Sequence, residues 1–259
     1  MKIIVLVKQV PDTYDERRLD TQTGRVDRGA SEAIVDEISE RALEVALRYK
    51  DSHKGTHITV LTMGPDSATA ALRKGLSMGA DAAIHLLDEA LSGSDMGQTA
   101  AALAAALPAN EYDLVIAGNE STDGRGGVVP AMIAEHLGLP HLSFLDTVEI
   151  AEDSVGGERA TEYGTQDVRA SLPAVITVTE RAAEARFPNF KGIITAKRKP
   201  MNVLTLAELD LDGSGVLAGG RSVVLTTSKR PERTAGTKIV DEGNAGDQLA
   251  DFLTANRLI

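Results

Sequence analysis

Short aliphatic runs alternate with segments of helical periodicity over the first half of the chain. The first run, Ile3–Val7, is apolar at every position, which is typical of a strand covered on both faces. From Asp36 to Tyr49 the apolar positions recur at helical spacing, and the acidic start suits a helix N-terminus. We also expect strands at 57–63, 82–87 and 114–117, and helices from Asp66 or Ser67 to Met78, from Ser94-Asp95 to near Pro108, and over 129–137.

This alternation predicts an α/β fold, in which a parallel twisted sheet is flanked by helices on both faces. Residues 10–31 are polar and indicate a long loop or loose hairpin. Beyond residue 145, short stretches at 147–150, 159–162 and 168–170 indicate a small antiparallel addition, and 173–179 a further buried strand. Residues 210–245 indicate an extended arm, followed by a short helix at 247–256. We therefore expect an α/β domain over 1–205 and a C-terminal arm over 206–259.

Composition narrows the classes of function. The chain has 259 residues, a net charge of -11 and no cysteine. The lack of cysteine excludes a disulfide scaffold, thiolate metal sites and a cysteine nucleophile. The acidic balance argues against nucleic acid as a general partner, because such binding needs a basic surface. No apolar run approaches the roughly 18 residues that span a bilayer, and we expect a cytoplasmic protein.

The turn Gly118–Gly127 is the richest candidate for ligand binding, because it follows an apolar strand and opens a helix. Ligands of parallel α/β sheets bind at the carboxyl ends of the strands, and backbone N–H groups in such a turn form an anion site. The turn matches neither the dinucleotide-binding motif nor the P-loop motif, and it lacks the P-loop lysine, which argues against nucleotide hydrolysis. From the residues alone, phosphate binding and an ordinary strand-to-helix turn both stay open.

No catalytic constellation stands out in the sequence. The five histidines show no metal-ligand spacing, and we interpret His136, on an apolar helix face, as a core histidine. No paired carboxylates and no Ser/His/Asp arrangement rise above chance. The sequence therefore predicts neither catalytic residues nor a metal site.

A basic segment spans residues 181–200, where six basic side chains oppose Glu184. Phe187, Pro188 and Phe190 lie within it, just before a helix expected to begin at about Lys191. Concentrated positive charge beside apolar side chains suits docking onto an acidic partner protein. Alternatively, both phenylalanines cover the protein's own core beside a solvated helix. A third interpretation, an anionic lipid or RNA surface, is disfavoured by the acidic remainder of the chain.

The stretch T-E-R-A-A-E-A-R-F-P-N-F-K-G-I-I-T-A-K-R-K-P resembles the signature of the β subunit of electron-transfer flavoproteins, the FixA-like group. The resemblance covers nearly the whole chain, through I-V-L-V-K-Q-V-P-D, L-S-M-G-A-D, L-V-I-A-G-N-E-S-T-D-G, L-P-A-V-I-T-V and A-G-T-K-I-V. It implies an adenine-nucleotide-binding α/β domain that holds AMP as a structural ligand, and a C-terminal arm around an α subunit that carries most of the FAD site. It also implies electron transfer from acyl-CoA and related dehydrogenases to a quinone oxidoreductase, with no catalysis by this subunit alone.

Carried over by position, the resemblance implies an AMP site made by the end of the first strand, the start of the first helix, one methionine and the glycine-rich turn. These residues are Leu6, Val7, Lys8, Asp36, Ile38, Ser39, Met63, Gly118, Asn119, Ser121, Asp123, Gly124, Arg125, Gly126, Gly127, Val128 and Val129. Asp123 falls at the family's recurrent acidic position. Polar residues often follow it in the family, whereas here backbone amides and Arg125 would have to hold the phosphate.

The resemblance also implies a docking loop for dehydrogenases at 187–194. Its residues, with the flanking basic ones, are Phe187, Pro188, Phe190, Lys191, Lys197 and Arg198. Phe190 falls where the family places a bulky apolar anchor, usually leucine. An aromatic residue that the family places against the flavin of the α subunit falls at Thr13 or Tyr14.

Two alternatives stay open at this point. Some branches of the family bind a second FAD in place of AMP and perform electron bifurcation with NADH, and the glycine-rich turn does not distinguish the two ligands. The chain could instead be a stand-alone ATP-binding α/β protein. The basic segment and the C-terminal arm disfavour that alternative, because a self-sufficient domain needs neither.

Overall fold

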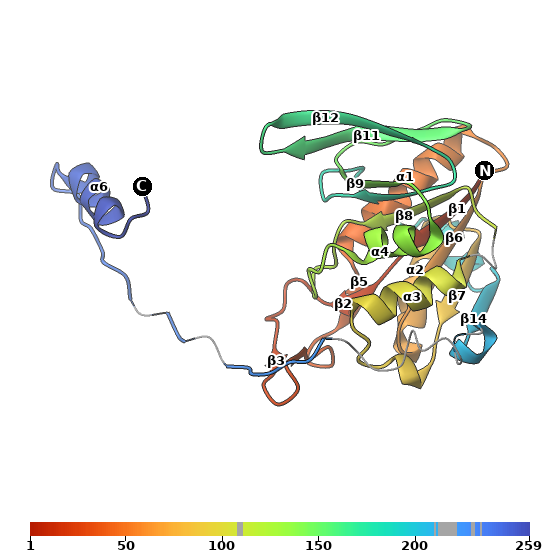
Figure 1. The fold of residues 1–259 in the computed structure, drawn as a ribbon, viewed down its shortest axis with the longest axis horizontal. Helices are drawn as coiled ribbons and strands as arrows, with labels where there is room; N and C mark the ends of the chain where they lie inside the picture. Colours follow the sequence, from red (N-terminus) through yellow and green to blue (C-terminus); the bar gives the residue numbers. More distant parts are fainter. Residues whose placement is uncertain (108–110, 210, 212–221, 229–230, 234) are drawn as a thin grey trace. The chain divides into compact units, whose positions relative to one another are not determined.

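The chain builds a seven-stranded sheet with helices on both of its faces (Figure 1). The computed structural model describes residues 1–107, 111–209, 211, 222–228, 231–233 and 235–259. In order across the sheet, the strands are β14 (Met201–Leu204), β7 (Ala82–Leu86), β6 (His57–Met63), β1 (Lys2–Leu6), β8 (Leu114–Gly118), β13 (Ala174–Val178) and β9 (His141–Leu145). Every neighbouring pair is parallel, which confirms the predicted α/β class.

The order of the strands reverses beside β1. From β1 the chain continues to β6 and β7 on one side, and it then returns to β8 on the other side. The connection that leaves β1 therefore runs to one side of the sheet, and the connection that enters β8 runs to the other. A gap remains between the loops that follow β1 and β8. In open parallel sheets this switch point, at the carboxyl ends of the strands, is where ligands bind.

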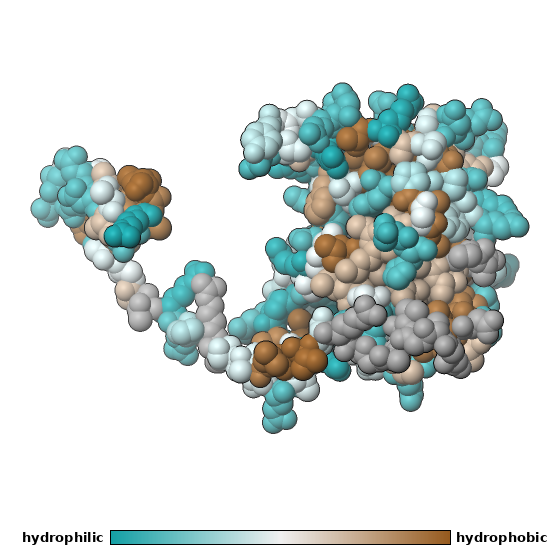
Figure 2. Space-filling model, in the orientation of Figure 1, coloured by the Kyte–Doolittle hydropathy of each residue, from teal (hydrophilic) through white to brown (hydrophobic). Residues whose placement is uncertain are grey.

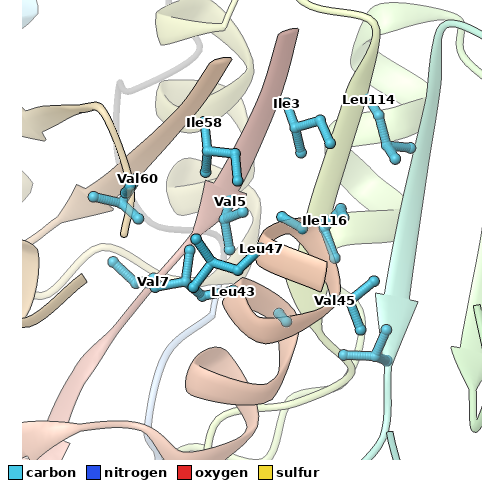
Figure 3. Close-up of a cluster of buried hydrophobic side chains, with 14 of the residues drawn as sticks. Ile3, Val5, Val7, Leu43, Val45, Leu47, Ile58, Val60, Leu114 and Ile116 are labelled. Atoms are coloured by element: carbon cyan, nitrogen blue, oxygen red, sulfur yellow. The ribbon is translucent and has the colours of Figure 1, made fainter. Parts of the chain in front are cut away.

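Alternation along the central strands gives the sheet two apolar faces. Ile3 and Val5 of β1 pack on the side of α1 (Glu37–Ser52) and α2 (Thr69–Met78), where Leu43 of α1 points at the sheet (Figure 3). Ile4 and Leu6 pack on the other side, against α3 (Met96–Ala106) and α4 (Val129–Leu137). The continuous aliphatic run of β1 is therefore explained by burial on both faces.

Most predicted elements are confirmed, with four differences. The segment expected to be capped by Asp66 or Ser67 begins as a 3₁₀ turn, η1 (Asp66–Ala68), and α2 starts only at Thr69 without a side-chain cap. Strands β9 and β14 join the parallel sheet although the sequence analysis did not predict them. His136 is exposed rather than part of the core, because it lies on the solvent side of α4.

The antiparallel addition is larger than expected. It consists of β10 (Glu149–Ile150), β11 (Ser154–Thr161) and β12 (Gly164–Ser171), and the last two form one long hairpin. Residues 10–31 contribute to two small ladders, in which β2 (Gln9–Pro11) pairs with β5 (Ala33–Val35) and β3 (Leu19–Asp20) with β4 (Arg25–Val26). Further short helices are η2 (Glu89–Leu91), α5 (Phe190–Ala196) and η4 (Leu206–Leu209).

The chain divides into two compact units, Met1–Leu225 and Thr226–Ile259. Strand β14 and the buried Leu206 of η4 belong to the first unit, so the division lies later than residue 205. Part of the predicted arm (210, 212–221, 229–230 and 234) lies outside the described residues, and 222–228 carry no regular secondary structure. The second unit contains α6 (Ala245–Ala255), close to the predicted helix. Among the described residues, no helix is both long and apolar enough to cross a membrane.

Candidate functional site: a cavity at the switch point of the sheet

A cavity of about 460 Å³ opens where β1 and β8 end. Its volume lies within the roughly 300–1,000 Å³ that small-molecule pockets occupy. Most of the predicted nucleotide-site residues line it, namely Leu6, Val7, Lys8, Ser39, Met63, Gly118, Asn119, Ser121, Gly124, Gly126, Gly127 and Val129. The structure thus brings together residues from four separate stretches of the sequence at the switch point.

Five predicted residues do not line this cavity, namely Asp36, Ile38, Asp123, Arg125 and Val128. Asp36 and Asp123 are covered by their own hydrogen-bond partners, as described below. Ile38 is buried in the first turn of α1, and Arg125 and Val128 are exposed. Neither of the last two is among the lining residues of the cavity.

Asp36 organises the rim of the cavity from within the protein. It caps α1, where its Oδ1 accepts hydrogen bonds from the backbone N–H groups of Ile38 (3.0 Å) and Ser39 (3.4 Å). Its Oδ2 accepts from the backbone N–H of Thr122 (2.7 Å) and from the Thr122 hydroxyl (2.8 Å). The fully buried carboxylate therefore joins α1 to the turn after β8.

Asp123 holds the two cations at the cavity. Its buried carboxylate lies 2.7 Å from Lys8 Nζ and 2.8 Å from Arg28 Nε. Lys8 Nζ also donates to the Ser121 hydroxyl at 3.1 Å. Burial alone would raise the pKa of Asp123, but Lys8, the Ser121 hydroxyl and Arg28 outweigh it, so the pKa lies well below its ordinary value. Lys8 and Arg28 are thereby fixed beside the glycine-rich turn.

At Gly124, Gly126 and Gly127, the turn after β8 presents backbone rather than side chains to the cavity. Gly127 has a φ of 65°, in the left-handed region that glycine adopts without strain, and Arg125 has a φ of 48°. A Cβ on Gly126 would lie 2.5 Å from Met96 Sδ. Helix α4 follows with Val128 at its N-cap position and no side-chain cap, so the N–H groups of Val129 and Ala131 remain available to an anion, while Pro130 between them has none.

The buried side chain of Asn119 is a second, separate observation that points to a ligand in this cavity. The residue is 8% exposed and lines the cavity. Its Oδ1 is buried and makes no hydrogen bond within the described part of the chain. A buried polar atom without a partner costs about 1–3 kcal/mol, so a ligand that supplies one gains affinity here. This orphaned atom and the glycine cradle both fit a ligand that carries a hydrogen-bond donor and an anionic group.

Several residues of the cavity are not predicted from the sequence, and these are Arg28, Leu61, Ser94, Asp95, Met96, Thr99, Leu103, Ala117, Glu120, Pro130 and Ser222. Arg28 lies in a polar segment without periodicity, and only its 95-residue separation from Asp123 closes the contact. Ser94 and Asp95 had been assigned to a helix cap, and Asp95 does cap α3. Because a helix cap that follows a strand lies at the carboxyl edge of the sheet, this cap is the sequence signal that could have placed Ser94 and Asp95 at the cavity.

The histidine with a shifted pKa, His141, lies apart from this cavity. No group of three or more His, Cys, Asp or Glu side chains is arranged to hold a metal ion within the described ranges. Burial, and then the charge of Arg159, lower the pKa of His141, whose Nε2 is buried without a partner in those ranges. His141 belongs to β9 and does not line the cavity.

The basic segment exposes both of its phenylalanines. Phe187 is 95% and Phe190 is 80% exposed, so the interpretation that they cover the protein's own core is wrong. Pro188 is half-buried, and Lys191, Lys197 and Arg198 are exposed around them. Two large apolar side chains held in solvent among cations have the composition of a docking surface.

The chain is similar to one protein family and, over nearly its whole length, to individual known proteins. The family described as "Electron transfer flavoprotein domain" matches residues 23–209. The electron transfer flavoprotein subunit beta of Mycobacterium leprae is 52% identical over 264 residues, covering 99% of both chains. The protein of the same name from Thermoanaerobacterium thermosaccharolyticum is 37% identical over 100% of both chains. The caffeyl-CoA reductase-Etf complex subunit CarD of Acetobacterium woodii is 34% identical over 98% of this chain and 97% of its own.

Proposed function

The chain belongs to the electron-transfer flavoprotein family as a beta subunit, and on this premise we propose that it binds AMP in the switch-point cavity. The cavity carries the proposal, because it joins a glycine cradle, a helix N-terminus without a side-chain cap, two cations and the Asn119 Oδ1, which has no partner among the described residues. The phosphate would lie at the turn and at the start of α4, where backbone N–H groups and the helix dipole favour an anion. Lys8 and Arg28 would add positive charge.

We propose that AMP has a structural role in this subunit. The protein would contribute binding and orientation, while the redox chemistry belongs to FAD held mainly by an α subunit. Tyr14 is 96% exposed and therefore free to contact such a partner. No catalytic residue of this chain is needed for an electron carrier of this kind.

Exposed apolar surface supports the heterodimer. In α6, Leu249 is 50% and Phe252 is 45% exposed, and no residue of that helix is buried within its own unit. Within the first unit, Val223, Val224 and Leu225 form a hydrophobic surface (Figure 2). A partner subunit that covers these side chains would supply the stability that the arm lacks by itself. We therefore propose that the C-terminal arm wraps the α subunit.

A truncation tests the role of the arm. Removing residues 245–259 deletes α6 and leaves the first unit unchanged, so the truncated chain should bind AMP but fail to co-purify with the α subunit. Leu249→Ala/Phe252→Ala is the milder variant, and Thr254→Ala on the same helix is its control. Co-purification of the truncated chain at the wild-type yield would refute this role.

The basic segment is the proposed docking site for electron donors. Its exposed phenylalanines would enter an apolar pocket of acyl-CoA dehydrogenase-type partners, and the surrounding cations would steer the encounter toward an acidic surface. Electrons would then leave to a quinone oxidoreductase. Such contacts are brief and small in area, so charge steering and a few anchors suit them.

One experiment tests the nucleotide assignment. The chain is purified with its α subunit, the nucleotides are released by denaturation, and they are identified and counted by chromatography. One AMP and one FAD per heterodimer is the expected result. Two FAD and no AMP would support the alternative of a bifurcating beta subunit, which oxidises NADH. A colourless preparation without adenylate would refute the proposal, and a stable flavin-free monomer that hydrolyses ATP would support the stand-alone alternative.

A further inference from the structure

Arg186, the residue that precedes the exposed Phe187, is clamped to α1 rather than free in solvent. Its Nε lies 2.7 Å from Glu44 Oε2 and its Nη2 lies 3.0 Å from Glu44 Oε1. Its backbone N–H also donates to Glu44 Oε2, at 3.2 Å. On the other side Nη2 lies 2.7 Å from Asp51 Oδ2. Both the side chain and the backbone at this position are therefore fixed by one helix.

The charges around this clamp favour a rigid contact. Glu44 is 4% exposed, and its carboxylate also accepts from Arg48 Nε at 3.2 Å. Hydrogen bonds from Arg186 lower the pKa of Asp51, and hydrogen bonds to Glu44 and then Asp51 raise the pKa of Arg186. Paired guanidinium–carboxylate bonds fix direction as well as distance, which a lysine cannot do. Each acidic group of the clamp thus has a guanidinium partner.

The other side of the exposed phenylalanines is held equally closely, against α2. A Cβ on Gly192 would collide with the backbone oxygen of Ser77, so α5 and α2 are in direct backbone contact. Arg73 Nη1 donates to the Ala196 carbonyl at 2.8 Å, and Lys199 Nζ donates to the Leu76 carbonyl at 2.8 Å. The segment from 187 to 191, which is exposed except at Pro188, therefore lies between two fixed ends.

We propose that Arg186 is a positioning residue for donor docking, which holds Phe187 and Phe190 in the orientation that a dehydrogenase binds. This inference rests on the proposed docking role of the basic segment. A loop that is ordered before the encounter loses less conformational entropy on binding, so its anchors bind more tightly. Arg186 itself is turned into α1 and need not touch the donor. Its effect is exerted through the two phenylalanines.

The test compares Arg186→Gln with Arg181→Gln in the heterodimer, using reduction of its flavin by an acyl-CoA dehydrogenase and its acyl-CoA substrate. Both variants remove one positive charge from the basic segment, but Arg181 is 68% exposed and its nearest carboxylate, that of Asp146, lies 3.9 Å away.

We expect Arg186→Gln to raise the KM for the heterodimer about tenfold with kcat within about twofold. Arg181→Gln should change KM by less than about threefold, and less still at high salt. Equal effects of the two variants would mean that Arg186 acts only by its charge, and would overturn the proposal.

A double-mutant cycle separates positioning from general stability. If Arg186 acts through Phe190, then Arg186→Gln should add little to the KM of Phe190→Ala, whereas independent effects would multiply. Multiplying effects would overturn the positioning role. An unchanged KM in Phe190→Ala alone would instead overturn the docking role of the segment, and this inference with it.

Arg186→Lys guards against a folding failure of the glutamine variant. It keeps the charge that buried Glu44 needs but cannot donate two parallel hydrogen bonds to one carboxylate. We expect an intermediate KM, with FAD and AMP contents equal to those of the wild type. A wild-type KM in Arg186→Lys would show that charge alone suffices, which contradicts the proposal.

Discussion

The Asp36 carboxylate and Thr122 lie 86 residues apart in the sequence but are joined by two hydrogen bonds, from the Thr122 N–H at 2.7 Å and from its hydroxyl at 2.8 Å. The same carboxylate caps α1. The first helix and the turn that forms the cavity are therefore held by one buried side chain. Their relative position therefore depends on the Asp36 carboxylate.

Asp36→Asn should weaken the contact between α1 and the turn after β8. An amide NH₂ in place of one oxygen cannot accept from Thr122 or from the helix N–H groups, and buried unpaired donors cost about 1–3 kcal/mol. We expect a lower melting temperature and loss of AMP on gel filtration. Thr122→Val removes only the hydroxyl bond and should have the smaller effect. A variant Asp36→Asn that melts like the wild type would contradict the assigned role.

The Lys8–Asp123–Arg28 contact predicts a defined dependence of stability on pH. The folded protein lowers the pKa of Asp123 below its ordinary value of 3.8. Stability from this group is therefore fully present above about pH 4 and is lost as the pH falls toward the lower folded pKa. Asp123→Asn should lower the free energy of unfolding by about 1–3 kcal/mol at pH 7, and the difference from the wild type should shrink below pH 4.

Urea unfolding of both proteins at several pH values between 3 and 7 measures this difference. Asp12→Asn is a suitable control, because Asp12 makes local hydrogen bonds but no ion pair with Lys8 or Arg28. A stability difference that grows as the pH falls would have the wrong sign and would refute the assignment.

Two adjacent glycines of the turn should respond differently to alanine. Gly127 has a φ of 65°, so Gly127→Ala strains the backbone by about 1–2 kcal/mol and should weaken AMP binding. Gly126 has no such φ, and a Cβ there meets only the side chain of Met96, at Sδ and Cγ, which is flexible and can move aside. Gly126→Ala should therefore retain AMP. Calorimetric titration of AMP into nucleotide-free heterodimer compares the two, and similar affinities would argue against a cradle that depends on backbone conformation.

Gly192→Ala should disturb α5. Its Cβ would meet the Ser77 carbonyl, which belongs to backbone and cannot move aside, so the helix must shift from α2. We expect a lower melting temperature and a higher KM for donor dehydrogenases, with unchanged flavin content. Gly246→Ala in α6 is the control, because a Cβ there meets nothing within 4 Å. A wild-type KM in Gly192→Ala would show that the position of α5 is unimportant for docking.

Periodicity and composition by themselves determined most of the architecture. The first strand, expected from the apolar run Ile3–Val7 and found at Lys2–Leu6, follows from a local pattern that burial imposes directly on the sequence. The strand at His57–Met63 and the helix over Val129–Leu137 follow in the same way. The glycine-rich turn could be placed at the carboxyl edge of a parallel sheet for the same reason. The resemblance then supplied most of the residues that line the cavity.

Only the tertiary structure decided which side chains meet. Arg28 reaches Asp123 across 95 residues and Arg186 reaches Glu44 across 142, and no local pattern encodes such pairs. Composition alone also does not tell whether Phe187 and Phe190 are exposed, because an apolar side chain in a loop can cover either the protein's own core or a partner. Hydrophobic periodicity records which face of an element is buried, whereas ion pairs and exposure depend on how distant elements pack.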